Sequence, residues 1–346
     1  MSGTANSIAG TTVSAGLARW AAPLETSVFE EALSDLRIEG SILLHGHHQP
    51  PWSVDVPDAA ELRLLMDLAP DTRVIPFHVV LSGSFVLGFE GEAAIELRQG
   101  QVIMCTDGAA HRMTQGQGAL SRAFEKVLTS GRWRHNSEGR LRSEGVTELV
   151  CGGFALRGGT LNPLLTALPR VLIVDTQAAD ANPMLAHIVA MIELELARSD
   201  RDTFAASRLI EILFAEALKD HACSDPGRSG WFRALGDAKV GRALARIHRN
   251  PGDALCVELL AAEAAISPSR FAARFREVMG QSVMAYVTQW RMNTACRKLR
   301  EGRAGLAEIA AQVGYQDTAS FSRAFKALVG RSPAHWRSAV RSQVTS

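Results

Sequence analysis

The sequence predicts an α+β protein: an N-terminal antiparallel β-barrel with helices, followed by an all-α C-terminal part that contains two helix-turn-helix motifs. Short apolar runs separated by Gly, Pro and Asp clusters fill much of residues 41–128, a spacing typical of the antiparallel strands of a barrel or a sandwich. A helical pattern near the C terminus occurs twice. Positive and negative charges are also distributed unequally between the two parts of the chain. Residues 232–346 hold 18 Lys and Arg against 8 Asp and Glu, a balance of +10, and the remainder has a balance of −9.

The N-terminal half begins with a segment that is rich in Ser, Thr, Gly and Ala, residues 1–22, which we expect to be a flexible tail. An amphipathic segment over residues 24–36 is expected to begin the ordered protein. The strand-like runs that follow are residues 41–44, 74–80, 85–89, 93–97, 101–104 and 121–128. These elements place one domain over residues 23–222.

Two helical patterns close this domain between residues 182 and 222, each with an apolar face. We expect these helices, or the barrel, to hold a homodimer. The run Cys-Ser-Asp-Pro-Gly-Arg-Ser-Gly at residues 223–230 is typical of a linker. Residues 231–346 then form the second domain, which opens with a helix over residues 231–248.

An internal repeat organises the second domain. Phe271, Phe275 and Gly280 recur fifty positions later as Phe321, Phe325 and Gly330. Upstream of Phe271 the offset is 49, so the second copy has one extra residue near its turn. Two copies are too few for a solenoid and indicate a duplicated module, at about residues 255–279 and 306–329.

Each copy is predicted to be helix, turn, helix. Ser267 stands where an N-cap is expected, and Pro268 occupies the first helical position, where its missing N–H costs nothing. Glycines end the second helices. In the second copy Gly314 ends the first helix, and Asp317 or Thr318 caps the next one.

Basic residues on the second helices point to duplex DNA. A helix from about residue 282 to 300 joins the copies, and about twenty helical residues span roughly 30 Å. One turn of B-DNA spans roughly 34–36 Å, so both second helices could enter successive major grooves. The candidate contact residues, to base edges or phosphates, are Ser269, Arg270, Arg274, Thr318, Ser322, Arg323 and Lys326. The deep narrow groove of RNA fits paired modules less well.

The C-terminal part resembles the AraC/XylS family of bacterial transcription regulators. The matching stretches include Ser267-Pro-Ser-Arg-Phe271, Ile309-Ala-Ala-Gln-Val-Gly-Tyr315, Phe321-Ser-Arg-Ala-Phe-Lys326 and Gly330-Arg-Ser-Pro333. The resemblance implies a non-enzymatic regulator that binds promoter DNA, with RNA polymerase as a further partner. Three residues depart from the family. Ala272 and Ala273 stand where a polar or basic residue is usual, and Ala265 stands where glycine is common.

The N-terminal part resembles cupin sensor domains. Gly100 to His111 is similar to the second cupin motif, and Phe77 to Gly83 is similar to a reduced first motif. The resemblance implies a small-molecule effector, with His78 and His111 as candidate effector-binding residues. Metal-binding cupins carry two histidines and a glutamate where this chain has only His78, so we expect no metal and no cofactor. A metal-dependent cupin enzyme is the alternative function.

The five cysteines are scattered and lack CxxC spacing, which argues against a zinc site and favours a reducing cytoplasm. A thiol sensor at Cys105 or Cys151 is a weaker alternative to plain burial. The first twenty residues lack a signal-peptide pattern, and no apolar stretch is long enough to span a membrane.

Overall fold

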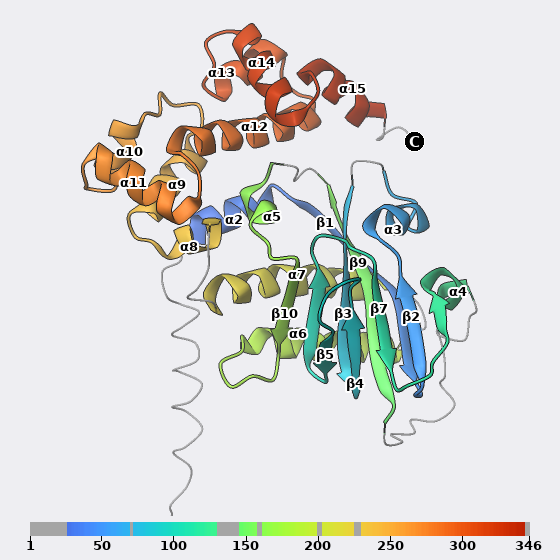
Figure 1. The fold of residues 1–346 in the computed structure, drawn as a ribbon. Helices are drawn as coiled ribbons and strands as arrows, with labels where there is room; N and C mark the ends of the chain where they lie inside the picture. Colours follow the sequence, from blue (N-terminus) through green and yellow to red (C-terminus); the bar gives the residue numbers. More distant parts are fainter. Residues whose placement is uncertain are drawn as a thin grey trace, which may run out of the picture. The chain divides into compact units, whose positions relative to one another are not determined.

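The computed structural model describes residues 26–69, 72–129, 145–157, 161–198, 203–224 and 230–342. The predicted tail, residues 1–22, and most of the predicted linker, residues 223–230, lie outside this set. Contacts divide the chain into two compact units (Figure 1). The first comprises mainly residues 38–157 and 169–223, and the second residues 23–37, 158–168 and 224–346.

The first unit contains two five-stranded sheets, with strand orders β1-β9-β3-β6-β10 and β5-β4-β7-β2-β8. The strands are β1 Arg37–His48, β2 Trp52–Val56, β3 Arg73–Ser82, β4 Ser84–Gly88, β5 Ile95–Arg98, β6 Gln101–Cys105, β7 His111–Gln115, β8 Ser121–Ala123, β9 Thr147–Arg157 and β10 Val171–Asp175. Each pair with an established register is antiparallel except β2 with β8. No pairing among the described strands closes the sheets into a ring, so the predicted barrel is a two-sheet sandwich.

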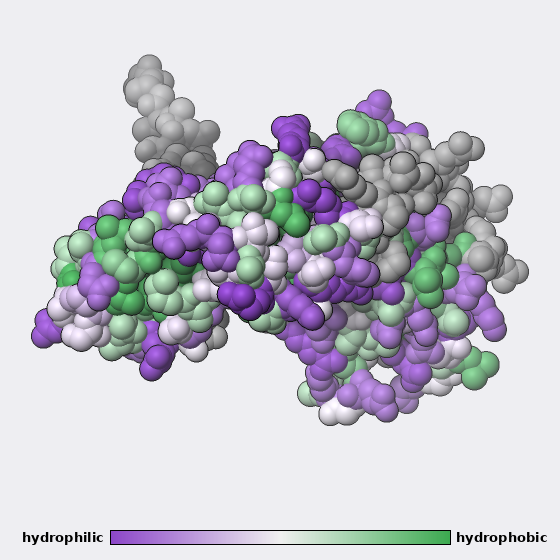
Figure 2. Space-filling view, turned by 90° about the horizontal axis from the view of Figure 1, so that it is seen from above, coloured by the Kyte–Doolittle hydropathy of each residue, from purple (hydrophilic) through white to green (hydrophobic). Residues whose placement is uncertain are grey.

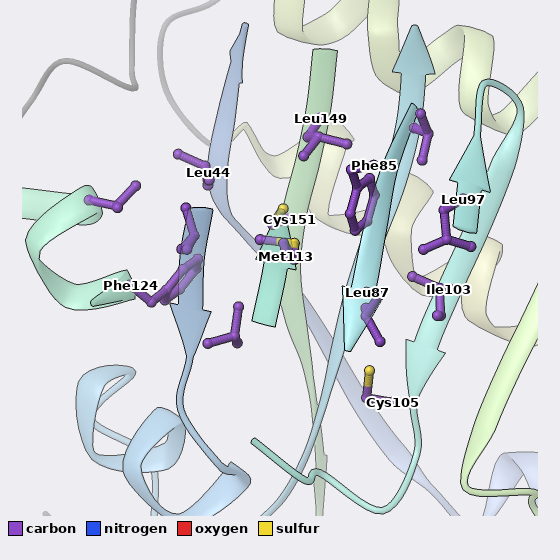
Figure 3. Close-up of a cluster of buried hydrophobic side chains, with 14 of the residues drawn as sticks. Leu44, Phe85, Leu87, Leu97, Ile103, Cys105, Met113, Phe124, Leu149 and Cys151 are labelled. Atoms are coloured by element: carbon purple, nitrogen blue, oxygen red, sulfur yellow. The ribbon is translucent and has the colours of Figure 1, made fainter. Parts of the chain in front are cut away.

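The core of this unit lies between the sheets. Side chains that alternate along each strand point into this space, so β3 contributes Val80 and β4 contributes Phe85 and Leu87. In Figure 3, Cys151 of β9 lies beside Met113 of β7, on the facing sheet. Full burial of one such side chain contributes about 1.5–3 kcal/mol, so this shared core holds the two sheets together.

Two helices, α6 Pro183–Arg198 and α7 Phe204–Ser224, accompany the first sheet (Figure 1). The ring of Phe214 lies 4.6 Å from that of Phe154 on β9. Gly40 is needed for this packing, because a Cβ there would lie 2.6 Å from the Ile210 side chain. Both helices were predicted from their apolar periodicity, and both are confirmed.

One predicted strand is partly wrong. Residues 121–128 were expected to be extended, but β8 ends at Ala123 and α4 Phe124–Thr129 follows. Phe124 and Val127 are three residues apart, a helical spacing that places both in the core. The sequence patterns also missed α3 Ala59–Leu65, which Asp58 caps by accepting the N–H groups of Ala60 and Glu61.

The second unit is helical. Its C-terminal helices are α8 Gly230–Gly236, α9 Val240–Arg249, α10 Val257–Glu263, α11 Pro268–Met279, α12 Val283–Glu301, α13 Leu306–Gln312, α14 Thr318–Val329 and α15 Pro333–Ser342. The single helix predicted over residues 231–248 is therefore two helices. Asp237 lies at the break and accepts the backbone N–H groups of Lys239 and Val240, which begins a new helix there.

Two short helices from earlier in the chain belong to the second unit: α2 Thr26–Ser34 and α5 Pro163–Thr166. The ring of Phe29 in α2 stacks at 6.3 Å on that of Trp231. Asn162, the N-cap of α5, donates from Nδ2 to the carbonyl of Ala32 at 2.7 Å. Contacts thus assign residues 23–37 and 158–168 to the helical unit, whereas the sequence placed them in the domain 23–222.

Candidate nucleic-acid interface

The first helix-turn-helix comprises α10 and α11. Phe271 and Phe275 are fully buried at helical spacing, which fixes the side of α11 that faces the protein. Ala265 lies in the turn with a φ of 53°, a left-handed backbone that disfavours any side chain. The equivalent residue of the second copy is Gly314, with a φ of 80°. This geometry explains why glycine is favoured at the position, and alanine is strained there.

The second helix-turn-helix comprises α13 and α14. Asp317 caps α14, and its carboxylate accepts the backbone N–H of Ser320 at 2.8 Å. Phe321 and Phe325 are fully buried in a cluster that includes Met292 and Leu299 of α12. Gly330 ends the helix with a φ of 80°, as predicted. The cap, the buried face and the terminating glycine all follow from the sequence pattern.

The connecting helix α12 is confirmed, and its basic residues are largely structural. Arg291 donates to the carbonyl oxygens of Pro251 and Asp253, at 2.8 and 2.7 Å. Arg297 pairs with the buried carboxylate of Asp35 at 2.6 Å. These two guanidinium groups therefore fix helices inside the unit.

The α14 candidates share an exposed side of that helix. Arg323 and Lys326 are both exposed and are three residues apart, so their side chains project from one face. Ala319, four residues before Arg323, extends this face towards the start of the helix. Thr318 and Ser322 are half-buried beside it. The face is about two turns long, and its charged members are both cations.

The α11 candidates are arranged differently. Ser269 and Arg270 are exposed at the start of the helix, whereas Arg274 is held by Asp237 through Nε at 2.9 Å and Nη2 at 2.7 Å. The carboxylate of Asp237 loses solvation on burial, yet hydrogen bonds from Arg274 and two backbone N–H groups lower its pKa overall. Asp237 lies 37 residues from Arg274, and no sequence signal paired them.

Hydrophilic side chains are spread over the face of the molecule that Figure 2 presents, interrupted by small apolar groups. In the helical unit the large exposed apolar residues include Leu259, Met284 and Leu328. The balance of +10 over residues 232–346 therefore resides on a surface of mixed polarity. Excess positive charge on such a surface attracts the phosphate backbone of nucleic acids.

In the sheet unit the structure brings His78 and His111 together, with 2.8 Å between their Nε2 atoms. Nδ1 of His111 lies 2.9 Å from the carbonyl of Ala109, which can only accept, so this nitrogen carries the proton. Nε2 of His111 then accepts from Nε2–H of His78. This leaves Nδ1 of His78 as a buried acceptor without a hydrogen-bond partner in the described part of the chain.

Burial lowers the pKa of both histidines, and for His78 the neighbouring His111 lowers it further. Both rings are therefore neutral near pH 7. Within the described ranges no group of three or more His, Cys, Asp or Glu side chains could hold a metal ion. Burial raises the pKa of the Cys105 thiol to about 12 and that of Cys151 further, so neither is a reactive thiolate at neutral pH.

Two family models match this chain: one described as Cupin over residues 27–223, and one described as a helix-turn-helix domain over residues 260–339. A protein described as an AraC-like transcription regulator, from Streptomyces lividans, is 30% identical over 275 residues, which is 77% of this chain and 87% of that protein. The chain belongs to the AraC-like transcription regulators.

The HTH-type transcriptional regulator AlkR of Acinetobacter baylyi is 31% identical to this AraC-like chain over 283 residues, covering 78% of it and 89% of AlkR. Among solved structures, the C-terminal domain of AraT from Geobacillus stearothermophilus is 30% identical, with a TM-score of 0.29, and covers 29% of the chain and 84% of that domain. The two family models and the identity to the AraC-like regulators show an AraC-type DNA-binding regulator with a cupin domain. No helix in the described residues has the length and apolarity needed to cross a membrane.

Proposed function

We propose that this regulator binds promoter DNA sequence-specifically, with α14 as the principal reader of bases. The observation that carries the proposal is the exposed pair Arg323 and Lys326 on a helix whose opposite side is anchored by Phe321 and Phe325. Arginine can bond O6 and N7 of guanine together, which contributes about 1–3 kcal/mol of discrimination. Thr318 and Ser322 lie beside this pair and contact bases or phosphates.

The first module contributes differently. Ala273 occupies the position equivalent to Arg323, and its methyl group offers only an apolar contact, such as one to thymine. Ser269, Arg270 and Arg274 remain the contact residues of α11. We therefore assign most base discrimination to the half of the site that α14 covers.

We propose that the cupin domain binds a small-molecule effector at His78 and His111. The support is the buried Nδ1 of His78, an acceptor that a donor group on an effector could satisfy. Two aromatic rings lie beside the pair: the ring centroid of Phe85 is 6.3 Å from that of His78, and the ring centroid of Phe89 is 5.7 Å from that of His111. This environment favours an effector that is mostly apolar and carries one hydrogen-bond donor.

The chain is proposed to act by binding, without catalysis. The relatives named above are transcription regulators, and His78 and His111 have no third side chain that would complete a metal site in the described residues. We propose further that it acts in the cytoplasm as a homodimer and that it contacts RNA polymerase at the promoter. The exposed apolar residues of α6, among them Met191 and Leu194, support the dimer.

The test is binding of the full-length protein to duplexes from the DNA that flanks its own gene, with random duplexes of equal length as competitors. We expect sequence preference, and affinity that falls steeply as salt rises, because neutralised phosphates release counterions. The Arg323→Ala, Lys326→Ala double variant should lose the preference, while the surface variant Arg122→Ala keeps it. A folded protein that binds all duplexes equally would refute the proposal.

A further inference from the structure

A cleft beside the first helix-turn-helix is lined by Lys239, Ile266, Arg270 and Arg274. It lies between the start of α9 and the N-terminal half of α11, so residues about thirty positions apart in the sequence form its walls. Three of the four lining residues are cations. Lys239 is half-buried, and Arg270 and Arg274 are exposed, so their charged groups are accessible to a ligand.

Asp237 fixes one wall of this cleft. Its carboxylate accepts the backbone N–H groups of Lys239 and Val240 and also binds Nε and Nη2 of Arg274. The side chain of Asp237 is only 8% exposed, so it is a rigid anchor. A guanidinium group has five N–H donors, and those that Asp237 does not engage remain available for an anion. The cleft keeps a net charge of about two, three cations against one carboxylate.

The described residues of the second module do not repeat this arrangement of cations. The residues equivalent to Arg270 and Arg274, fifty positions on, are Ser320 and Ala324. Its helix start is also occupied, since Asp317 accepts the N–H of Ser320, whereas Ser267 makes no side-chain cap on α11. The two cations of α11 therefore belong to the first module, which has Ala273 in place of the reader arginine, and the equivalent positions of the second module, which has Arg323, are uncharged.

We infer that the cleft of Lys239, Arg270 and Arg274 binds a backbone phosphate of duplex DNA, and that Asp237 is the positioning residue that presents Arg274 to it. The first module then anchors the protein on the DNA backbone, and the second reads the bases. Planar guanidinium groups suit phosphate oxygens, and a lysine adds a compact charge. This role rests on the promoter binding proposed above.

The test uses the full-length protein and two duplexes of equal length, one random and one selected for tight binding. Lys239→Ala and Arg270→Ala should each weaken binding, by the same factor for both duplexes. Each should also make the dependence of log K on log salt less steep, reducing the magnitude of the slope by about one. Arg274→Ala should do the same. Arg122→Ala removes an equal charge from an exposed strand of the other unit and should leave the slope unchanged.

The outcomes separate this inference from the function on which it rests. If the wild-type protein prefers the selected duplex but Lys239→Ala and Arg270→Ala keep its salt slope, the cleft binds no phosphate and only the inference is wrong. If either variant changes base preference instead of overall affinity, the cleft reads bases and the inference is again overturned. If the wild type binds no DNA, the proposed function itself fails. Melting temperatures near wild type establish that Lys239→Ala and Arg270→Ala are folded, whatever the stability of Arg274→Ala.

Discussion

Asp35 and Asn293, which lie 258 residues apart in the sequence, are joined by a hydrogen bond of 2.8 Å from the Asn293 amide to the Asp35 carboxylate. The same carboxylate pairs with Arg297, one helical turn further along α12. Asp35 directly follows α2, and Arg37 begins β1 of the first sheet. Asp35 therefore attaches the chain to α12, the helix between the two DNA-binding modules, two residues before the first strand of the sheet domain begins.

Burial raises the pKa of Asp35 although Arg297 lowers it, so the loss of solvation outweighs the ion pair. We expect Asp35→Asn to change the free energy of unfolding by less than about 1 kcal/mol, because asparagine keeps an acceptor for Asn293 and removes a buried charge. Asp35→Ala should cost about 1–3 kcal/mol, since it leaves the buried Asn293 amide unpaired. Urea denaturation of both variants measures the difference. Equal losses would mean that the ion pair with Arg297 carries the stabilisation.

Arg323→Ala should relax base preference within one half of the DNA site, more than Arg270→Ala or Arg274→Ala does. The reason is that Arg323 is exposed on α14, whereas Arg274 is held by Asp237. A lost arginine–guanine contact corresponds to about 1–3 kcal/mol at that base pair. Binding to a library of single-base variants of the site measures this preference. Full preference retained in a folded Arg323→Ala protein would make α11 the reader.

Met191→Glu or Leu194→Glu should convert a dimer at micromolar concentration to a monomer. Both side chains are apolar and exposed, at 44% and 65%, and they are three residues apart on α6. A carboxylate there would be desolvated in an interface. Light scattering reports the mass, and Ala186→Glu, on another side of the same helix, is the matched control. A wild-type monomer, with and without DNA, would contradict the proposed dimer.

Acid should destabilise the protein from about pH 6.5 downward. Burial lowers the pKa of His48 and His248 to about 3, and that of His78 well below its usual range. These rings stay neutral in the folded state, while the unfolded chain takes up protons below about pH 6.5. Stability is therefore complete above that pH and is lost as the pH falls. Between pH 7.5 and 5.5 each such histidine should cost about 1.4 kcal/mol.

Urea denaturation at several pH values checks this expectation. The variant His78→Leu lacks one titrating ring, so its free energy of unfolding should fall less steeply over the same interval. The comparison concerns the slope with pH, so a change in overall stability does not affect it. An identical slope in the two proteins would show that His78 takes up its proton over the same pH interval in the folded and the unfolded state, which would contradict the expectation.

Local sequence signals were enough to predict the two helix-turn-helix modules and to name candidate residues on their second helices. Caps, terminating glycines and the spacing of Phe271 and Phe275 are local signals, because a helix is decided by residues within a few positions of one another. The cupin-like motif similarly located His78 and His111 on strands that the structure brings within hydrogen-bonding distance. Alternation failed at residues 121–128, where Phe124 and Val127 satisfy a helical spacing equally well.

The contacts between residues that are distant in the sequence could not be predicted from these local signals. The bond between Asp35 and Asn293, the pairing of Asp237 with Arg274, and the assignment of α2 and α5 to the helical unit leave no mark on local periodicity. The sequence also could not decide whether the sheets close into a barrel, since the position of strands along the chain does not say whether the edge strands of the two sheets pair. A single sequence records which face of each element is apolar. Which surface covers that face depends on how all the elements pack at once, and that packing makes Arg291 and Arg297 of the connecting helix internal supports.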